Sequence, residues 1–455
     1  MMNIETNTSL INVPEHALKA LSILEKGGYE AWLVGGFVRD ALRGYQANDI
    51  DIATSALWEQ GKALFEAAGY NVFETGIKHG TISVRINSQV LEITSYRSES
   101  AYSDNRHPDS VSFHKSIEKD LARRDFTINA IAYHPHRGLF DPYDGRTDIE
   151  KKCIRAVGEP KVRFSEDALR ILRAVRFASQ LGFHIDNATT KAMKCKKCLL
   201  DAIATERIAH ELDYFVCGTY IHDALMNNIE IIGQVIPEAL PMVRFDQKTP
   251  YHIYDVLEHT AYCMQHCTPS SLVRWAAFFH DIGKPASFFT DEKGVGHFYG
   301  HAIISMDIAS TVMKRLRFPT TLFDHVLRLV QHHDDVIAPT TKAVKRMLAK
   351  LEGSPELFRA LCDLKKGDAS AQAPHCCERI DLANNLEMIL DQILEENDVF
   401  ALRHLAISGK DVLALGVAAG PEIGHLLAQA LDAVINEEIS NNKKDLIAFI
   451  ESLRV

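Results

Sequence analysis

The chain has 455 residues, which is too long for a single hydrophobic core; at roughly 150 residues per domain, about three domains are expected. Hydrophobic residues make up 46% of the chain and charged residues 24%, as in an ordinary globular protein. No apolar run approaches the roughly 18 residues that a membrane span needs, so the composition excludes a membrane-embedded protein.

Residues 1–10 are polar and lack the basic and apolar regions of a secretory signal peptide, so a cytoplasmic protein is expected. The nine cysteines are an odd number without paired spacing, and a reducing compartment keeps them as thiols. Cys195 and Cys198 form one CxxC pair. Because no second pair follows, a structural zinc site is not expected there.

The net charge of −10 argues against a nucleic-acid partner, because neutralisation of phosphates supplies much of the affinity for nucleic acids. The distribution of charge is more informative than its total. Basic residues gather in one part of the chain: Lys151, Lys152, Arg155, Lys161, Arg163, Arg170, Arg173, Arg176, Lys194, Lys196 and Lys197. Such a run is also typical of a solvated face, so by itself it identifies no partner.

The spacing of apolar residues predicts a mixed α/β region at the start of the chain. The predicted elements, in chain order, are a helix over residues 14–25, a strand over 31–34, a helix over 38–43, and strands over 50–52, 81–86 and 90–95. Gly27-Gly28 ends the first helix, and Gly35-Gly36 forms the turn between the first strand and the second helix.

Beyond residue 148 strand signals fade, and amphipathic stretches over residues 166–181 and 203–215 predict helices. Prolines mark a boundary near residue 240, and residues 370–374 mark another. These signals divide the chain into four parts, which are residues 1–147, 148–240, 241–372 and 373–455.

Asp49-Ile50-Asp51 places two carboxylates two residues apart. On a strand both point to the same face while Ile50 points to the other. Like charges held this close favour a hard cation, and Mg²⁺ is typically bound by few protein carboxylates together with substrate phosphates. Taken alone, an Asp-x-Asp sequence is more typical of a turn or a surface strand.

The preceding Gly35-Gly36-Phe37-Val38-Arg39-Asp40 is a glycine turn from strand to helix, whose backbone N–H groups can bind a triphosphate. The combination of GGxxRD with D-x-D nine residues later resembles the nucleotidyltransferase superfamily, and in detail the bacterial-type CCA-adding enzymes of the poly(A) polymerase superfamily. The resemblance implies that Asp49 and Asp51 are the catalytic Mg²⁺ ligands and that Gly36 and Arg39 bind phosphates. Glu92 is a candidate third acidic group near the metal.

Two further motifs carry the resemblance. Arg123-Arg124-Asp125-Phe126-Thr127-Ile128-Asn129 is similar to the family's next motif and implies a triphosphate contact for Arg124. Thr205-Glu206-Arg207-Ile208 is similar to a later motif, and we expect it to brace the preceding helix.

Residues 166–177 carry polar side chains that step by three, so on an α-helix Asp167 and Arg170 are neighbours on one face, whereas Arg176 lies nearly opposite. The simplest interpretation of the pair is a surface salt bridge. As a base-recognition pair, Asp167 accepts from an exocyclic amine and Arg170 donates to an unprotonated ring nitrogen.

Cytosine and adenine offer that edge, whereas uracil and guanine place a carbonyl against the aspartate and an N–H against the arginine. The family assigns this role to the matching residues and gives the later arginines contacts with nucleotide or phosphate. The resemblance therefore implies nucleotide-binding roles for Asp167, Arg170, Arg173 and Arg176.

Relatives in this superfamily also include CC-adding enzymes, A-adding enzymes and poly(A) polymerases. Residues 99–116, with Arg106-His107-Pro108-Asp109, are similar to the loop that full CCA-adding and A-adding members need, which disfavours CC-only addition. Gly76-Ile77-Lys78-His79-Gly80 lacks the arginine-rich stretch of the poly(A) polymerases. A-only addition stays open, as does a nucleotide phosphohydrolase whose first domain only binds nucleotides.

His280-Asp281-Ile282-Gly283-Lys284 follows His259 and, with a distal aspartate, resembles the HD phosphohydrolase superfamily. Imidazole and carboxylate suit a divalent transition metal of unassigned identity. The resemblance implies His259, His280, Asp281 and Asp368 as ligands, with His301, His332 and His333 available for a second metal. Asp334 and Asp335 are the alternatives to Asp368.

The resemblance implies an α+β fold class. Residues 1–147 are expected to form a nucleotidyltransferase head with a small mixed sheet, 148–240 an all-α neck with the base-recognition helix, 241–372 an HD-type helical domain and 373–455 a helical tail. The tail glycines, among them Gly409, Gly420 and Gly424, either approach tRNA phosphates or cap helices. The expected partners are tRNA, CTP and ATP, with no membrane partner and no assigned oligomeric state.

Overall fold

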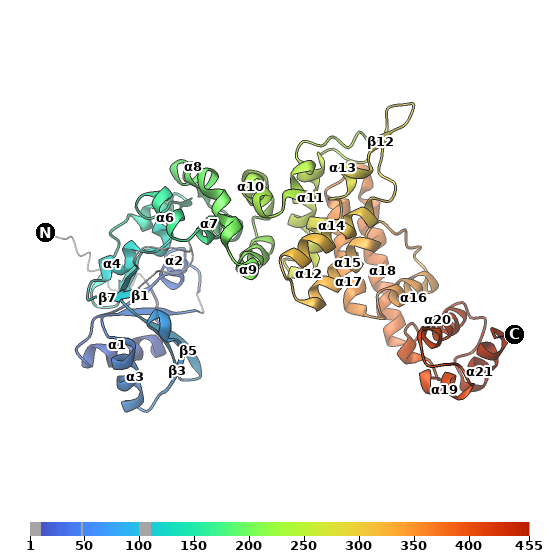
Figure 1. The fold of residues 1–455 in the computed structure, drawn as a ribbon, viewed down its shortest axis with the longest axis horizontal. Helices are drawn as coiled ribbons and strands as arrows, with labels where there is room; N and C mark the ends of the chain where they lie inside the picture. The colour runs from blue at the N-terminus through green and yellow to red at the C-terminus, as the bar shows by residue number, and fades with distance from the viewer. Residues whose placement is uncertain (1–10, 47–48, 100–110, 455) are drawn as a thin grey trace. The chain divides into compact units, whose positions relative to one another are not determined.

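The computed structural model describes residues 11–46, 49–99 and 111–454, and the chain forms two compact units (Figure 1). The first unit extends to Phe215 and also takes Glu230–Val235; the second consists of Val216–Ile229 and the chain from Ile236 onward. No helix in the described part of the chain combines the length and apolar character needed to cross a bilayer.

A seven-stranded mixed sheet forms the centre of the first unit, in the order β3-β4-β5-β2-β1-β8-β9. Its strands are β1 (Ala31–Val34), β2 (Asp51–Thr54), β3 (Asn71–Gly76), β4 (Thr81–Ile86), β5 (Gln89–Ser95), β8 (Ala132–His134) and β9 (Gly138–Phe140). β2 and β5 are parallel and the other neighbouring pairs are antiparallel. The register places Asp51 between Val34 of β1 and Glu92 of β5, so two acidic residues lie side by side in the middle of the sheet.

Helices pack on this sheet because their apolar stripes match its buried strands. α1 (Glu15–Lys26) and α3 (Trp58–Ala67) contact each other and the sheet, with Leu24 and Phe65 fully buried. β1 is buried along its whole length and leads directly into α2 (Gly36–Leu42). The strands and helices predicted for this region are confirmed, with ends that differ by one or two residues.

The rest of the first unit is mainly helical. Its elements are α4 (Ile117–Ala122), α5 (Gly145–Glu150), α6 (Pro160–Glu166), α7 (Leu169–Leu181), α8 (Asn187–Lys196) and α9 (Thr205–Val216), with β6 (Arg97–Glu99) paired to β7 (Val111–Phe113). A short parallel pair, β10 (Cys153–Ile154) with β11 (His184–Ile185), was not expected beyond residue 148. A strand of two residues is too short to show an alternation of apolar and polar residues in the sequence.

The predicted continuous helix over residues 166–181 is wrong at its start. α6 ends at Glu166, Asp167 is extended with φ −140° and ψ 105°, and α7 begins at Leu169. The Asp167 side chain accepts a hydrogen bond from the Leu169 backbone N–H at 3.0 Å, so it caps the new helix instead of continuing the old one.

The second unit is a bundle of helices with one hairpin. Its elements are α11 (Val256–His266), α12 (Ser271–Phe279), α13 (Lys284–Ser287), β12 (Phe289–Thr290), β13 (Gly296–His297), α14 (His301–Arg315), α15 (Thr320–His332), α16 (Thr341–Lys350), α17 (Pro355–Ser370) and α18 (Glu378–Glu395). α11 packs on α17, α12 on α15 and α14 on α15. α18 packs along α17, although it follows the boundary expected near residue 372.

The end of the chain has a hydrophobic core of its own. α19 (Gly409–Ala414), α20 (Pro421–Ile435) and α21 (Lys443–Ser452) bury Val412, Leu431 and Ile450 together. Gly420 is the N-cap residue of α20, whereas Gly409 is the first residue of α19 and follows the N-cap residue Ser408. α10 (Ile221–Val235) contributes residues to both units.

Candidate functional site

Three carboxylates meet at the centre of the first sheet. Asp51 begins β2, Glu92 lies beside it on β5, and Asp49 is exposed just before the strand. Burial raises the pKa of the Asp51 carboxyl, Arg124 opposes that rise, and Glu92 and Asp49 add to it. Negative groups gathered in this way favour a divalent cation, so the residues fit the Mg²⁺ site that the sequence predicts.

Gly35 is required by the approach of two side chains. Its φ is +73°, and a Cβ at this position would lie 3.0 Å from Arg124 Nη1 and 3.3 Å from Asp51 Oδ2. A larger residue would therefore be strained in its backbone and would crowd both groups. Gly36 follows as the first residue of α2.

Arg39 and Arg124 have different surroundings. Arg39 donates to both carboxylate oxygens of Asp40 at 2.9 and 2.7 Å and to Asn129 Oδ1 at 2.9 Å. Arg124 makes longer contacts, 3.4 Å to the Asn129 carbonyl and 3.5 Å to Asp120. Arg124 is therefore held more weakly and can turn toward an anion at lower cost.

A cavity of about 1300 Å³ joins these groups to the helices that follow. Every residue predicted for catalysis or nucleotide binding lines it: Gly36, Arg39, Asp49, Asp51, Arg124, Asp167, Arg170, Arg173 and Arg176. All of them belong to the first unit. The cavity thus brings the predicted metal ligands and the predicted base-recognition residues to one place.

The predicted pairing of Asp167 with Arg170 on one helix face is wrong. Asp167 lies before α7, and its Oδ2 is 3.3 Å from Arg207 Nη2. Arg170 is 7% exposed and donates to Glu166 at 2.7 Å and to the Arg123 carbonyl at 2.9 Å. Each member of the pair is therefore oriented by its own partner.

Arg207 is a site residue that sequence reasoning missed. It was expected only to brace a helix, yet it lines the cavity and contacts Asp167. The motif Thr205-Glu206-Arg207 was recognisable, but the loop geometry that turns Asp167 toward it was not.

Arg176 was expected nearly opposite the Asp167–Arg170 pair on the helix, yet it lines the same cavity as Arg170 and Arg173. Arg173 donates twice to Asp125 Oδ2, at 2.8 and 2.6 Å, and Arg176 lies 3.2 Å from Glu211. Arg173 and Arg176 are thus fixed in position by the buried carboxylates of Asp125 and Glu211.

These carboxylates respond differently to burial. Burial alone would raise the pKa of Asp125, but Arg173 and Asn129 outweigh it and hold that pKa below its ordinary value. For Glu211 burial outweighs Arg176 and Arg173, and its pKa is raised. Asp125 is therefore the firmly ionised anchor of the cavity wall.

Residues 100–110, which include the Arg106-His107-Pro108-Asp109 segment of the expected loop, lie outside the described residues.

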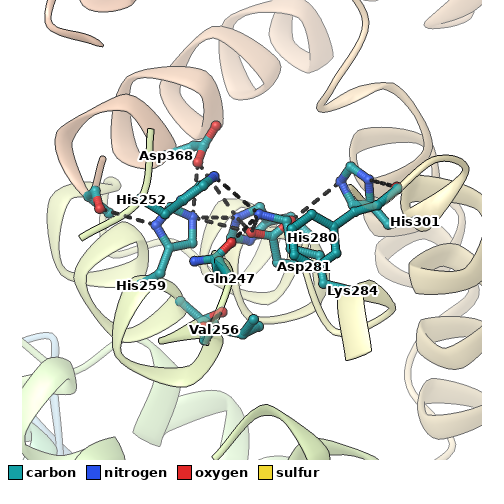
Figure 2. Close-up of polar contacts among 12 residues, drawn as sticks. Gln247, His252, Val256, His259, His280, Asp281, Lys284, His301 and Asp368 are labelled. Atoms are coloured by element: carbon teal, nitrogen blue, oxygen red, sulfur yellow. Dashed lines mark hydrogen bonds and ion pairs between the residues drawn. The ribbon is translucent and has the colours of Figure 1, made fainter. Parts of the chain in front are cut away.

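In the second unit, two groups of possible metal ligands lie in the helical bundle (Figure 2). The first group contains His259 of α11, His280 after α12 and Asp368 of α17. The second contains Asp281, His301 and His333. Within each group the ligand atoms lie within 4.8 Å of one another, so each group can hold one ion.

The four histidines are oriented alike. In each of them Nδ1 contacts a backbone carbonyl. The Nδ1 atom of His259 lies 3.2 Å from the Ala371 carbonyl oxygen and that of His280 lies 2.7 Å from the Ala277 oxygen. The Nδ1 atoms of His301 and His333 lie 2.9 Å and 2.7 Å from the carbonyl oxygens of Phe298 and Val330. Their Nε2 atoms face each other in pairs, 3.3 Å apart for His259 and His280 and 3.1 Å for His301 and His333. An Nδ1–H held by a carbonyl leaves Nε2 as an electron-pair donor, the arrangement typical of metal-binding histidines.

Asp281 connects the two groups. Its Oδ2 lies 3.3 Å from His259 Nε2 and 3.2 Å from His280 Nε2, and its Oδ1 lies 3.4 Å from His301 Nε2. One carboxylate between two sets of imidazoles fits a pair of cations better than a single one.

His332 does not join either group among the described residues. Its Nδ1 lies 3.0 Å from Asp335, which also pairs with Lys350 at 2.9 Å. The expectation that His332 could serve a second metal is therefore wrong, and Asp335 does not replace Asp368.

Two residues beside this centre were not singled out from the sequence. Lys284 is buried, with its Nζ 2.7 Å from Asp281 Oδ2 and 2.8 Å from Gln247 Oε1. The His252 ring stands edge-on to that of His259 at 4.7 Å, and burial, with Lys284 and His259 nearby, lowers its pKa to about 3. The His252 imidazole is therefore uncharged at neutral pH and packs beside the site.

The fold and the two sites define a nucleotidyltransferase followed by an HD domain. Residues 31–155 match the family described as the poly A polymerase head domain, and residues 250–389 match the HD domain family. Residues 182–241 match a probable RNA and SrmB-binding site of polymerase A. Head and HD domains of these kinds generally use divalent metals.

A CCA-adding enzyme of Leuconostoc citreum (strain KM20) is 33% identical over 447 residues, which cover 97% of both chains. One from Limosilactobacillus reuteri (strain DSM 20016) is 32% identical over 96% of both chains. The chain belongs to the CCA-adding enzyme family.

Solved structures agree with this assignment. The Bacillus stearothermophilus CCA-adding enzyme in complex with CTP is 28% identical, with 97% of both chains covered and a TM-score of 0.71. A Thermotoga maritima CCA-adding enzyme complexed with tRNA is 20% identical, with 97% of this chain and 96% of that chain covered and a TM-score of 0.53. At that identity the likeness concerns the fold.

Proposed function

We propose that this chain adds CCA to the 3′ ends of tRNA, using CTP and ATP and no nucleic-acid template, in the cytoplasm. The observation that carries the proposal is the single cavity in which Asp49 and Asp51 lie together with Asp167 and Arg170. Full-length similarity to proteins named CCA-adding enzymes supports the complete reaction over A-only addition or poly(A) synthesis.

Asp49 and Asp51 are the proposed ligands of Mg²⁺, which when bound lowers the pKa of the primer 3′-hydroxyl and neutralises the triphosphate. Glu92 beside Asp51 adds negative charge to the same site. Gly35-Gly36 provides space and backbone N–H groups for the phosphates. Arg124, close to Asp51, is the strongest candidate for a direct phosphate contact.

Asp167 and Arg170 are the proposed base-recognition residues. A carboxylate has acceptor sites in excess of the two contacts that Asp167 makes with Leu169 and Arg207, so it can also accept from the amine of cytosine or adenine. Glu166 and the Arg123 carbonyl fix the plane of the Arg170 guanidinium, so the direction of its hydrogen bonds does not depend on the nucleotide.

Arg39, Arg173 and Arg176 complete the proposed nucleotide site. Each is already tied to a carboxylate, Asp40, Asp125 or Glu211 respectively. They therefore act as a preorganised positive wall for the triphosphate and the RNA end, with little reorganisation on binding.

A second activity is supported by the ligand arrangement of the HD domain. We infer a phosphomonoesterase or cyclic phosphodiesterase centre with His259, His280 and Asp368 at one metal position, His301 and His333 at the other, and Asp281 between them. Divalent transition metals, when bound, lower the pKa of water and polarise phosphoryl oxygens.

Separate variants test the two assignments. Asp49→Ala and Asp51→Ala should abolish CTP incorporation into tRNA and leave phosphate release unchanged. His280→Ala, or removal of metal by a chelator followed by exchange into Mg²⁺, should do the reverse. If Asp51→Ala lost both activities while the protein stayed folded by circular dichroism, the assignment of the two activities to separate sites would be contradicted.

A further inference from the structure

An aromatic surface projects from the HD domain on the hairpin formed by β12 and β13, which Figure 1 shows next to α13. Phe289 faces His297 across the two strands, and Tyr299 follows His297 by two residues. Tyr299 lies in the turn after β13, and its ring contacts those of both Phe289 and His297, so the three rings form one cluster. We call Phe289, His297 and Tyr299 the outer rings.

The His297 ring is nearly parallel to each of the other two outer rings, whereas Phe289 and Tyr299, 5.5 Å apart, have planes at 46° to each other. The centroids of Phe289 and His297 are 5.3 Å apart with planes at 26°, and those of His297 and Tyr299 are 5.5 Å apart at 21°. Tyr299 is 76% exposed and Phe289 45%, unusually high for aromatic side chains.

The hairpin does not need the outer rings to hold its place. The opposite face carries Phe288 and Phe298, whose rings lie 5.5 Å apart, and Phe288 packs edge-on against Phe245 at 5.2 Å. Gly296 is seated so tightly that a Cβ there would lie 2.2 Å from the Gln247 carbonyl oxygen. The inner face therefore anchors the hairpin, and the outer face is left to solvent.

Asp291 fixes the orientation of the middle ring. Its Oδ1 accepts from the backbone N–H groups of Lys293 and Val295, both at 2.9 Å, and its Oδ2 lies 3.1 Å from His297 Nε2. The turn thus holds the imidazole plane in line with its neighbours before any ligand binds.

The outer rings lie close along the chain to a predicted metal ligand. Tyr299 precedes His301 by two residues, so their Cα atoms are at most about 7 Å apart. On the inner face, Lys284 Nζ lies 5.2 Å from the centre of the Phe298 ring and 2.7 Å from Asp281. The segment that carries Tyr299 therefore leads directly into α14, whose first residue is the predicted ligand His301.

We propose that Phe289, His297 and Tyr299 are a stacking platform for the base of the molecule whose phosphate the HD centre hydrolyses, so that its substrates are nucleotides or single-stranded RNA ends. This inference rests on the proposed phosphohydrolase function. Exposed aromatic rings bind any base by its π-face, so the platform selects for a nucleobase and not for its identity.

Kinetics with two substrates test the platform. Metal-loaded full-length protein is given adenosine 3′-phosphate or glycerol phosphate, which has no ring to stack. Phe289→Ala and Tyr299→Ala should each raise the KM for adenosine 3′-phosphate about tenfold at similar kcat, because base–aromatic stacking has this strength. Glycerol phosphate hydrolysis should not change. Tyr220→Ala removes an exposed tyrosine elsewhere in the same unit and is the matched control. An equal KM in all variants would overturn the proposal.

Cross-linking gives a readout that needs no hydrolysis. A single-stranded RNA hexamer ending in 4-thiouridine 3′-phosphate is irradiated with the full-length protein, and the adducts are mapped by mass spectrometry. Adducts on residues 289–299 are expected, and they should be lost in Tyr299→Ala but kept in Tyr220→Ala. Adducts confined to other segments would contradict the platform, as they would if this face bound a protein instead. Adducts at the hairpin without phosphate release from either substrate would contradict only the proposed phosphohydrolase.

Discussion

Asp167 and Arg170, the proposed base-recognition residues, are each oriented by other groups of the molecule. Neither is paired with the other; Arg207 and Leu169 orient the carboxylate, and Glu166 with backbone carbonyls orients the guanidinium. Preorganised donors and acceptors discriminate between bases better than mobile ones, because the wrong base then leaves fixed polar groups unpaired.

Replacement of Asp167 by alanine should remove the acceptor for the exocyclic amine. We expect kcat/KM for CTP and ATP to fall about tenfold to hundredfold, as for lost hydrogen bonds to charged groups, and UTP or GTP to be admitted. Incorporation of each nucleotide into a tRNA transcript measures the change. An unchanged preference for C and A would contradict the base-recognition role.

Arg207→Ala tests whether Arg207 acts by positioning the Asp167 carboxylate and not by contacting the nucleotide itself. The variant keeps Asp167 but frees its Oδ2, so we expect misincorporation of UTP to rise and the KM for CTP to rise more than kcat falls. Arg207→Lys should restore part of the selectivity, since it keeps the charge but not the fork geometry. Equal defects in Ala and Lys variants, together with a lower melting temperature, would indicate a purely structural role.

At the scale of elements, the strands and helices of the head were predictable because their apolar residues have a clear period, and Pro14, Gly27 and Gly35 mark the ends of the first ones. The break between α6 and α7 was not, since the residues from Glu166 onward have good helical spacing and, of the two residues between the helices, only Asp167 has non-helical backbone angles. The ladder of β10 and β11 is too short to leave a pattern.

The HD ligands illustrate the same limit. His259 and Asp368 come from α11 and α17, and only the packing of these two helices brings the ligands together. His332 and His333 are adjacent in sequence, and a rotation of about 100° per residue sends one toward Asp335 and the other toward His301. The chemistry of the site was readable from the residue types, but the choice between neighbours was not.

Gly35 at the junction of β1 and α2 gives a prediction at this scale. Gly35→Ala should cost about 1–3 kcal/mol of stability through its positive φ and also suppress CTP incorporation by displacing Arg124 or Asp51. Gly69 also has a positive φ, +84°, but no atom lies within 4 Å of a Cβ added there. The Gly69→Ala protein should therefore be less stable but still incorporate CTP. Thermal unfolding and a primer-extension assay measure both. Full incorporation in Gly35→Ala would be inconsistent with a crowded phosphate turn.

The link between Asp125 and α7 should make the first unit sensitive to acid. The pKa of Asp125 is lower in the folded state, so its ion pair with Arg173 stabilises the fold above the unfolded value of about 3.9 and is lost as pH falls through the folded value. Asp125→Asn should therefore cost about 1–3 kcal/mol at pH 7 and progressively less below pH 4. Urea unfolding at several pH values checks this; a cost independent of pH would exclude the ion pair as its origin.

At the scale of the whole molecule, the chain carries two groups of proposed site residues, one in each unit. We propose polymerisation in the cavity of the first unit and hydrolysis in the helical bundle of the second. The chain carries a net charge of −10, yet its polymerising cavity is lined by arginines that buried carboxylates hold in place. RNA binding is therefore a local property of this surface and not of the overall charge.

The most direct test supplies purified protein and Mg²⁺ with tRNA transcripts that end in the discriminator base, in C or in CC, together with CTP, ATP or both, and sequences the products. The account predicts that all three transcripts are completed to CCA, with C added before A and no growth beyond the terminal A. Growth of the CC-ended transcript alone by one A, long A tails, or no growth of any transcript would contradict it.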